Sequence, residues 1–498
     1  MHPFRERIGL TLFVAYLSVG LSQVATQIFF LLVFRLLPVE AVGIYTLAIA
    51  VATLYAYVMD LGLTTFLVGE LSQHSYRLAT VVWAVVIVRL PVAVLGGLGI
   101  QVWAWLVRPA FADYQIMVLV ALSYFLQLLE LSAISWLQVQ QQQIAVNLLS
   151  VVMPTGRLLG MLFLYWTGYE ATLLYVGWLV FLTQSLSALC FLVVVLMSNS
   201  PAIVKIGAPL QDELRQLLQG FWLRGRKLTV MYAFVALQAR ADWLLVSGLL
   251  SKVALANYSL GNKVLELAML LAGVGARTTF PWLSRTDAGD SFLRSRLALI
   301  RRGFILLSVL VCIGLFYWSP VLITLLLGNK YEEADLVVKV LTLGGAIFML
   351  NQYLFYTVLA EKLEREYGWI VVAATFVQFT ADIFLIPRLG LLGAALGLLG
   401  MGITLHVGQL GLLMRQAILD FAEVIRLEIF MLASIVFTAL LWLINLNLVA
   451  ATLAACGVSL LLSRWLILGS DWAYIAHSAP RLWSKLVDVT TQAFQAKG

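Results

Sequence analysis

Charged side chains are scarce in this sequence. Asp, Glu, Lys and Arg make up 11% of the 498 residues, and hydrophobic residues make up 62%. A soluble domain carries roughly 25% charged residues, so this composition excludes a soluble globular protein. The formal net charge is +7. In a chain this apolar it does not indicate nucleic-acid binding, because the basic residues of a membrane protein mainly set its orientation.

Cysteine and histidine are also few, and they are scattered. Each of the three cysteines lies inside an apolar run, which is typical of small buried side chains rather than of disulfides or metal ligands. They are Cys190, Cys312 and Cys456. The four histidines lie far apart, with no zinc or haem spacing: His2, His74, His406 and His477. The sequence therefore predicts neither a metal site nor an organic cofactor.

Long apolar runs fill most of the chain. A membrane-spanning helix needs about 20 apolar residues, and this rule predicts fourteen spans. Their approximate bounds are 8–34, 40–67, 78–107, 114–138, 144–166, 172–197, 228–250, 253–283, 303–327, 335–360, 368–386, 391–414, 424–445 and 448–468. The first run is too long for a signal-peptide core of about 7–15 residues, so we expect it to remain as a span. The sequence predicts an all-α integral membrane protein with fourteen transmembrane helices.

The distribution of basic residues predicts the orientation. If the N-terminus is cytoplasmic, most Lys and Arg residues outside the spans lie in cytoplasmic segments. The outer loops then contain only Arg35, Arg108, Lys252, Lys330 and Arg388. Because cytoplasmic loops are enriched in Lys and Arg, we expect both termini to face the cytoplasm.

A weak internal repeat predicts the domain organisation. A shift of 213 residues aligns residues 30–38 with 243–251, and Gly62 with Gly275. Six spans separate the copies, which is an even number, so the repeat is parallel, about an axis along the membrane normal. We expect an N-terminal lobe at 1–200, a cytoplasmic linker with an interfacial helix at 201–227, a second lobe at 228–415, two further spans in 416–468 and a cytoplasmic tail at 469–498.

Four stretches of the chain carry a family resemblance. They are Glu40-Ala-Val-Gly-Ile-Tyr-Thr-Leu-Ala, Asp60-Leu-Gly-Leu-Thr-Thr-Phe-Leu-Val, Ala241-Asp-Trp-Leu-Leu-Val-Ser-Gly and Leu385-Ile-Pro-Arg-Leu-Gly-Leu-Leu-Gly-Ala-Ala-Leu-Gly. The chain resembles, over nearly its whole length, the polysaccharide (O-antigen, Wzx-type) flippases of the multidrug/oligosaccharidyl-lipid/polysaccharide exporter superfamily. The resemblance implies two six-helix lobes in a V-shaped arrangement, followed by two C-terminal helices, and alternating access.

The resemblance also implies a cargo and a place in the cell. The cargo would be an oligosaccharide linked to undecaprenyl pyrophosphate, and the location the inner (cytoplasmic) membrane. Membrane lipids, a polysaccharide polymerase and glycosyltransferases would be the partners, with no nucleic acid. Two alternatives within the superfamily stay open, a lipid II flippase and a multidrug or cation exporter.

Several cations lie inside the predicted spans. An ionised side chain at mid-bilayer costs about 2.5–3.5 kcal/mol on insertion scales, so each needs a partner or a hydrated surface. Guanidinium groups bind phosphate in a bidentate manner and stay charged in such places. We interpret these cations as substrate-binding residues for the pyrophosphate, with structural ion pairing as the alternative. They are Arg89, Arg157, Arg240, Lys263 and Arg277.

Acidic residues in the spans have two interpretations, as counter-ions or as coupling sites for H⁺ or Na⁺. The candidates are Asp60, Glu130, Asp242 and Glu266. Glu266 lies three residues after Lys263, so these two can pair on one helix face. Asp382 lies near the predicted outer end of its span, where we expect it to be solvated.

The outer loops argue against an enzyme. A polysaccharide polymerase or a lipid-linked glycosyltransferase needs catalytic groups in a sizeable loop outside the cytoplasm. The longest outer loop, 327–335, contains only Asn329-Lys-Tyr-Glu-Glu between its flanking residues. It offers neither a nucleophile nor a metal cluster nor an acid–base pair, so we expect a transport protein without catalytic residues.

Overall fold

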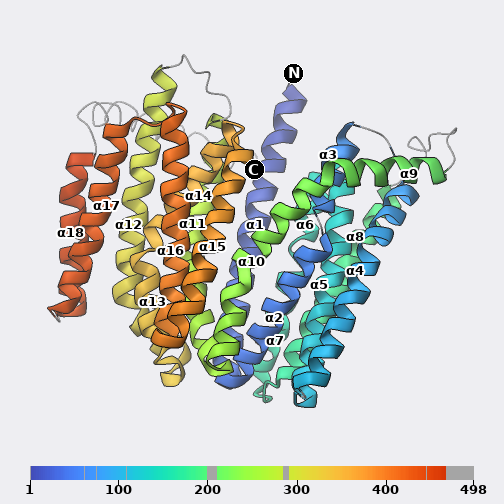
Figure 1. Ribbon diagram of the computed structural model, residues 1–498, viewed down its shortest axis with the longest axis horizontal. Coiled ribbons are helices and arrows are strands. Elements are labelled where there is room, and N and C mark those ends of the chain that lie inside the picture. Colours follow the sequence, from blue (N-terminus) through green and yellow to red (C-terminus); the bar gives the residue numbers. More distant parts are fainter. Residues whose placement is uncertain are drawn as a thin grey trace, which may run out of the picture. The chain divides into compact units, whose positions relative to one another are not determined.

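The computed structural model describes residues 2–60, 62–73, 76–107, 109–198, 210–283, 291–444 and 446–466. Within these ranges the chain consists of helices and short turns, with no strand (Figure 1). The predicted all-α fold class is confirmed.

Helices follow one another with short connections. They are α1 (His2–Leu36), α2 (Val39–Asp60), α3 (Leu63–Gln73), α4 (Leu78–Val107), α5 (Phe111–Val139), α6 (Gln143–Leu149), α7 (Val152–Thr167), α8 (Leu173–Ser198), α9 (Leu210–Gly220), the π-helical turn η2 (Phe221–Gly225), α10 (Arg226–Leu249), α11 (Lys252–Leu283), α12 (Ser291–Leu327), the 3₁₀ turn η3 (Asn329–Tyr331), α13 (Ala334–Leu343), α14 (Gly345–Ala360), α15 (Glu364–Leu389), α16 (Leu391–Arg415), α17 (Phe421–Leu443) and α18 (Leu448–Leu466).

Each predicted span coincides with one helix or with two consecutive helices. The second span is divided between α2 and α3, the fifth between α6 and α7, and the tenth between α13 and α14. Gly62, at the first division, has φ +77°, a left-handed conformation that glycine adopts without steric cost. The axes of α13 and α14 are bent by 48°.

The number of membrane spans is smaller than the number of helices. Among the described residues, 10 helices are long and apolar enough to cross a membrane, or up to 11 if the bent pair α13–α14 counts as one span. Neither α10 nor α11 is among them. These two helices carry charged residues in their interiors: Arg240 and Asp242 in α10, and Lys263 and Glu266 in α11. The predicted count of fourteen spans stays a prediction.

The chain forms two compact units. The first contains Met1–Gly261, Val321–Val337 and Val371–Met401, and the second contains Asn262–Pro320, Val338–Ile370 and Gly402–Gly498. In the first unit α2, α4, α5 and α8 run side by side, α10 lies along α2, and α7 packs against α1 and α8 (Figure 1). The predicted lobe boundaries, the V-shaped arrangement and the interfacial position of α9 stay predictions.

Equivalent residues of the internal repeat meet within the first unit. Thr46 of α2 and Ser259 of α11 have their hydroxyl oxygens 3.5 Å apart, and they are separated by the repeat shift of 213 residues. A contact between equivalent residues is what a two-fold axis passing between two copies produces. The contact agrees with a two-fold relation between the copies, and the parallel orientation of the repeat stays a prediction.

Close approach of α2 to the start of α11 depends on a glycine. A Cβ atom placed on Gly43 would lie 1.9 Å from the backbone oxygen of Lys252. Since the obstructing atom belongs to the backbone, a side-chain rotation cannot relieve the clash. Gly43 therefore sets the distance between the two copies of the repeat.

In the second unit, α12, α14 and α17 share an apolar core that includes Ile313, Phe316, Met349 and Phe430. The hydroxyl of Tyr317 donates to the backbone oxygen of Thr438 at 2.8 Å, which ties α12 to α17. Next to α17 lies α18, at its side in Figure 1.

We expect Gly43→Ala to destabilise the protein by about 1–3 kcal/mol, the usual cost of overpacking. The measurement is the apparent Tm of the purified protein in detergent. Gly97→Ala on α4 is the matched control, because a Cβ atom at Gly97 meets nothing within 4 Å. Equal Tm values for the two variants would contradict the packing described for α2 and α11.

Candidate substrate and ion sites

Arg89 of α4 is held in a closed polar pocket. Its side chain is 1% exposed, and Nη2 lies 2.5 Å from Asp60 Oδ1. The guanidinium also donates to Thr64 Oγ1 at 2.7 Å, to Ser132 Oγ at 2.5 Å and to the backbone oxygen of Leu128. A cation so enclosed has no open face for a ligand. This is the geometry of the ion-pairing alternative for both Arg89 and Asp60.

Asp60 also forms hydrogen bonds at the division between α2 and α3. Its Oδ1 accepts hydrogen bonds from the backbone N–H of Thr64 at 3.3 Å and from Thr64 Oγ1 at 2.5 Å. These bonds satisfy donors that the start of α3 leaves without partners inside the helix. The carboxylate therefore joins α2, α3 and α4 at one point.

Arg157 of α7 lies in a different setting. Its side chain is partly exposed, and Nε donates to Thr183 Oγ1 of α8 at 3.4 Å. Electrostatic interactions connect the guanidinium to Tyr45, Tyr124 and Glu130. Among the residues that the structure describes, no carboxylate forms an ion pair with it. The guanidinium N–H groups of Arg157 thus remain largely available for a ligand. Those of Arg89 are mostly bonded to the protein.

Glu130 of α5 completes the polar cluster around Arg157. It is 8% exposed, and it accepts from Gln184 Nε2 at 2.5 Å and from Ser187 Oγ at 3.0 Å. Tyr124, on the same helix, receives a hydrogen bond from Thr53 Oγ1 at 3.1 Å. We call Arg157, Glu130, Tyr45, Tyr124 and Thr183 the Arg157 cluster. It draws on α2, α5, α7 and α8, and sequence spacing alone did not bring its members together.

Arg240 and Asp242 of α10 point to different neighbours, as expected for residues two apart. The Arg240 guanidinium lies over the ring of Trp243, with Cζ 4.1 Å from the ring centroid, which is a cation–π contact. Asp242 is 3% exposed and accepts a hydrogen bond from the hydroxyl of Tyr258 at 2.7 Å. Each charge therefore has its own stabilising contact.

The remaining candidates lie on α11. Lys263 Nζ and Glu266 Oε2 are 2.6 Å apart, as an i,i+3 pair on one helix face. This contact corresponds to the local pairing that the sequence predicted for them. Arg277 belongs to the same helix, but its side chain lies outside the part of the structure that is described.

Asp382 of α15 is not solvated, contrary to expectation. Its side chain is 1% exposed, because α15 continues to Leu389 and leaves Asp382 about two turns inside the helix. Its Oδ1 packs directly over Gly397 of α16, where an added Cβ would lie 1.9 Å away. The prediction was wrong because the helix end was placed too early.

A cavity of about 180 Å³ lies beside Asp382, between α10 and α15. Gln378 and Asp382 line it together with Phe234, Leu237 and Phe379. Asp382 Oδ1 and both polar atoms of Gln378 have no hydrogen-bond partner, although buried polar groups normally have one. The charge of Asp242 also faces Asp382. The i,i+4 spacing of Gln378 and Asp382 was a signal that the sequence analysis missed.

A larger cavity of about 490 Å³ lies between α2, α4, α5 and α10. Its lining includes Leu47, Val51, Met117 and Leu244 and is almost wholly apolar. Tyr55 also lines the cavity and packs over α4, donating its hydroxyl to the backbone oxygen of Ala93. The space suits hydrocarbon better than sugar, because few hydrogen-bonding groups reach it.

Comparison with known proteins identifies the family. The family model described as Polysaccharide biosynthesis protein matches residues 32–335, which is more than half of the chain. The chain belongs to this family. Among curated proteins, none matches the sequence.

Solved structures with a similar fold confirm the fold class of this protein. The chain is similar to "Lipid II flippase MurJ, inward closed conformation", with TM-score 0.64, 13% identity, and coverage of 91% of this chain and 98% of that chain. It is also similar to an inward-facing multidrug resistance MATE family transporter of the MOP superfamily, with TM-score 0.55, 14% identity, and coverage of 79% and 94%. At these identities the likeness concerns the fold.

The chain is thus a multi-pass membrane protein of a polysaccharide biosynthesis family, with a fold similar to that of these two membrane proteins. The resemblance inferred from the sequence motifs is confirmed. The titles of the two similar solved structures describe a flippase and a transporter.

We expect Asp60→Asn and Arg89→Met to lower the stability of the folded protein strongly, by about 3–5 kcal/mol each, because either change leaves a buried charge without its partner. The double variant Asp60→Asn/Arg89→Met removes both charges and should recover much of the loss. Apparent Tm values in one detergent measure all three. Strictly additive losses would contradict the buried pair.

Proposed function

We propose that the protein is a flippase that moves an oligosaccharide linked to undecaprenyl pyrophosphate across the cytoplasmic membrane by alternating access. Both termini would face the cytoplasm, as the distribution of Lys and Arg indicates. The observation that carries the proposal is Arg157, a partly exposed cation within the apolar part of the chain that forms no ion pair with any described carboxylate.

The chemistry of the substrate explains why such a cation is useful. A pyrophosphate group carries negative charge that has to pass through a region of low dielectric constant, and a guanidinium group offers it parallel N–H donors and a permanent positive charge. In this proposal Arg157 binds the pyrophosphate first. Arg240, stacked on Trp243, contributes a second positive charge, with Lys263 and Arg277 as further candidates.

One hydroxyl group near Arg157 supports the same assignment. Tyr124 is partly exposed and accepts from Thr53, so its own hydroxyl proton can be donated to a phosphate or sugar oxygen. Glu130 is held by Gln184 and Ser187, so it reduces the net charge of the site without blocking Arg157. A partial counter-charge suits a transporter. Without any nearby carboxylate, the positive charge of Arg157 would bind the pyrophosphate too tightly for release.

The two alternatives differ in their chemistry. A lipid II flippase would use the same pyrophosphate contact with a different sugar. A multidrug or cation exporter would be expected to present a net acidic site, whereas the Arg157 cluster contains one cation and one carboxylate. Polysaccharide polymerase and glycosyltransferases would be the partners of the first function, since they produce and consume its cargo.

We further propose that cation coupling involves Asp242 and Asp382. Two carboxylates that face one another in a buried site repel each other unless a proton or a metal cation neutralises them. The cavity beside Asp382 has room for a small cation. The unpartnered oxygen atoms of Asp382 and Gln378 are ligands of the type that hard cations prefer. Glu130, whose two oxygens are already bonded, is the weaker candidate.

Arg157→Gln should abolish surface polysaccharide at unchanged protein level, because the neutral amide cannot hold the pyrophosphate charge. Arg157→Lys should retain partial function, since a point charge remains without the bidentate fork. The measurement is complementation of a flippase-deficient strain, followed by electrophoresis of the polysaccharide. Arg388→Gln is the control, because Arg388 is exposed on α15. Normal polysaccharide in Arg157→Gln would remove Arg157 from the mechanism.

Asp382→Asn should uncouple transport from a cation gradient while leaving substrate binding intact. The assay is translocation of a lipid-linked oligosaccharide in proteoliposomes with an imposed Na⁺ or H⁺ gradient. We expect at least a tenfold loss of the gradient-dependent rate for Asp382→Asn and little loss for Glu366→Gln, an exposed position on the same helix. An unchanged dependence on both gradients in Asp382→Asn would contradict the coupling role.

A further inference from the structure

A histidine in the second unit lies between two hydrogen-bond acceptors. His406 of α16 is 4% exposed. Its Nδ1 lies 2.8 Å from Asn351 Oδ1 of α14, and its Nε2 lies 2.8 Å from Glu428 Oε1 of α17. The ring therefore connects three helices through its two nitrogens.

The orientation of the Asn351 amide is set by its other bond. Asn351 Nδ2 donates to the backbone oxygen of Gly402 at 2.9 Å, so the network assigns Oδ1 to the side of the ring. An amide oxygen only accepts hydrogen bonds. The Nδ1 atom of His406 must then carry a proton.

The contact on the other side of the ring requires one more proton. A neutral imidazole has a single N–H, and Nδ1 already has it. Without a further proton, the lone pair of Nε2 would face a carboxylate oxygen, which is repulsive. The bond forms either as imidazolium with carboxylate or as imidazole with carboxylic acid. In both cases one proton lies between Nε2 and Oε1.

From this count we propose that His406, Asn351 and Glu428 form a proton-binding site, and that the bound proton fastens α17 to α14 and α16. Release of the proton breaks the bond between α16 and α17 and leaves the bond to Asn351 intact. The inference does not depend on the proposed cargo or on the Asp382 site, since it needs neither.

The other groups around the site do not offer a second cation that could pair with Glu428 in place of a protonated His406. On α16, Gln409 is neutral and donates to the backbone oxygen of Asn351 at 3.4 Å. Tyr367 of α15 interacts with Gln409. Glu423 precedes Glu428 on α17, and two arginines of α12 contact it: Arg301 Nη2 at 2.5 Å and Arg302 Nη2 at 3.2 Å. Tyr353 of α14 lies near Arg301 and Glu423. Arg426 of α17 is exposed.

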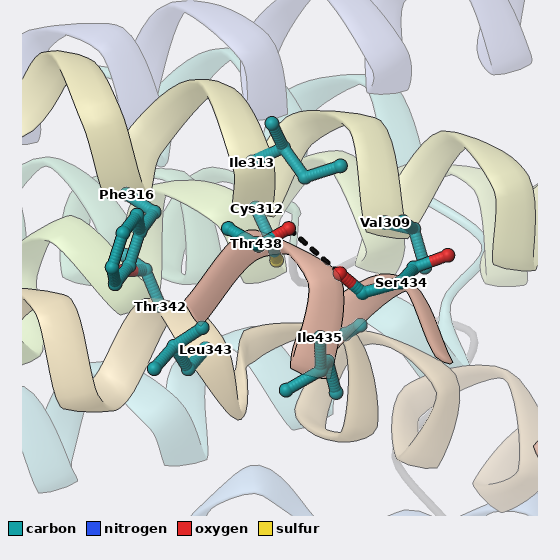
Figure 2. Close-up of a pocket in the computed structure, with 10 residues that line it drawn as sticks. Val309, Cys312, Ile313, Phe316, Thr342, Leu343, Ser434, Ile435 and Thr438 are labelled. Carbon is teal, nitrogen blue, oxygen red and sulfur yellow. Dashed lines mark hydrogen bonds between the residues drawn. The ribbon is translucent and has the colours of Figure 1, made fainter. Parts of the chain in front are cut away.

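Beyond these polar contacts, a small cavity lies where α17 packs against α12. Figure 2 shows a small cavity, of about 10 Å³, lined by Val309, Cys312 and Phe316 of α12 and by Ser434 and Thr438 of α17. Thr438 donates to the backbone oxygen of Ser434, while Ser434 Oγ has no hydrogen-bond partner. Because the Glu428 bond is the polar contact between α16 and α17, its loss should change the position of α17 relative to α16.

The test measures the distance between α16 and α17 as a function of pH. Spin labels at Val407 and Leu432, both exposed to the surroundings of the helices, report it in full-length protein in nanodiscs, with the native cysteines replaced. Across a series of pH values, we expect one narrow distance distribution at the acidic end and a broader or longer one at the basic end.

Glu428→Gln separates proton binding from simple contact. The amide N–H of glutamine can donate to Nε2 of a neutral ring, so this variant should keep the short distance at every pH. Glu366→Gln on α15 is exposed and should behave as the unmodified chain. A distance independent of pH in the unmodified chain, or a transition that persists in Glu428→Gln, would overturn the proposal.

Imidazole ¹⁵N spectra provide a check that does not require the glutamine variant to fold. In protein labelled at histidine, the signal lost in His406→Gln belongs to His406. We expect the Nε2 resonance to shift with pH over the same range as the distance transition, while Nδ1 keeps the shift of a protonated nitrogen. A His406 Nε2 resonance that stays constant across the transition would refute the assignment of the proton.

Discussion

The structure depends on one constraint: a polar or charged group inside an apolar bundle must be satisfied by the protein itself. Arg89 and Asp60 show the complete form of it. The guanidinium is surrounded by a carboxylate, two hydroxyls and a backbone oxygen, and the same carboxylate closes the break between α2 and α3. A buried pair of this kind specifies a geometry more than it adds stability, since two apolar residues of similar size can replace it at little cost.

Other charges in the chain are satisfied only in part, and the proposed transport function rests on these. Arg157 has one long hydrogen bond to Thr183 and a distributed electrostatic environment. Asp382 and Gln378 have unpartnered atoms beside a cavity. In a protein that alternates between states, a group that is fully bonded in one state gives nothing to a ligand. Incomplete satisfaction is thus a physical criterion for choosing among the buried charges.

The two units use polar contacts differently. In the first unit they surround the helices of the repeat, and glycines such as Gly43 let the backbones of the two copies approach closely. In the second unit they connect α17 to the rest through Glu423 and Glu428, next to an apolar contact with a cavity in it (Figure 2). The family model ends at residue 335, so α17 and its proton-dependent contact lie outside the part of the chain that defines the family.

The sequence by itself determined the membrane class, the position of a helix at each apolar run and the family, because hydropathy, chain length and local motifs are properties of single segments. It also identified the Lys263–Glu266 pair, since both residues lie on one helix. Only the tertiary structure decided that Arg89 is enclosed by Asp60, that Arg157 joins Glu130 and two tyrosines, and that Asp382 is buried beside Gln378. These contacts join helices distant in sequence, and a single helix carries no information about which neighbour its polar face will meet.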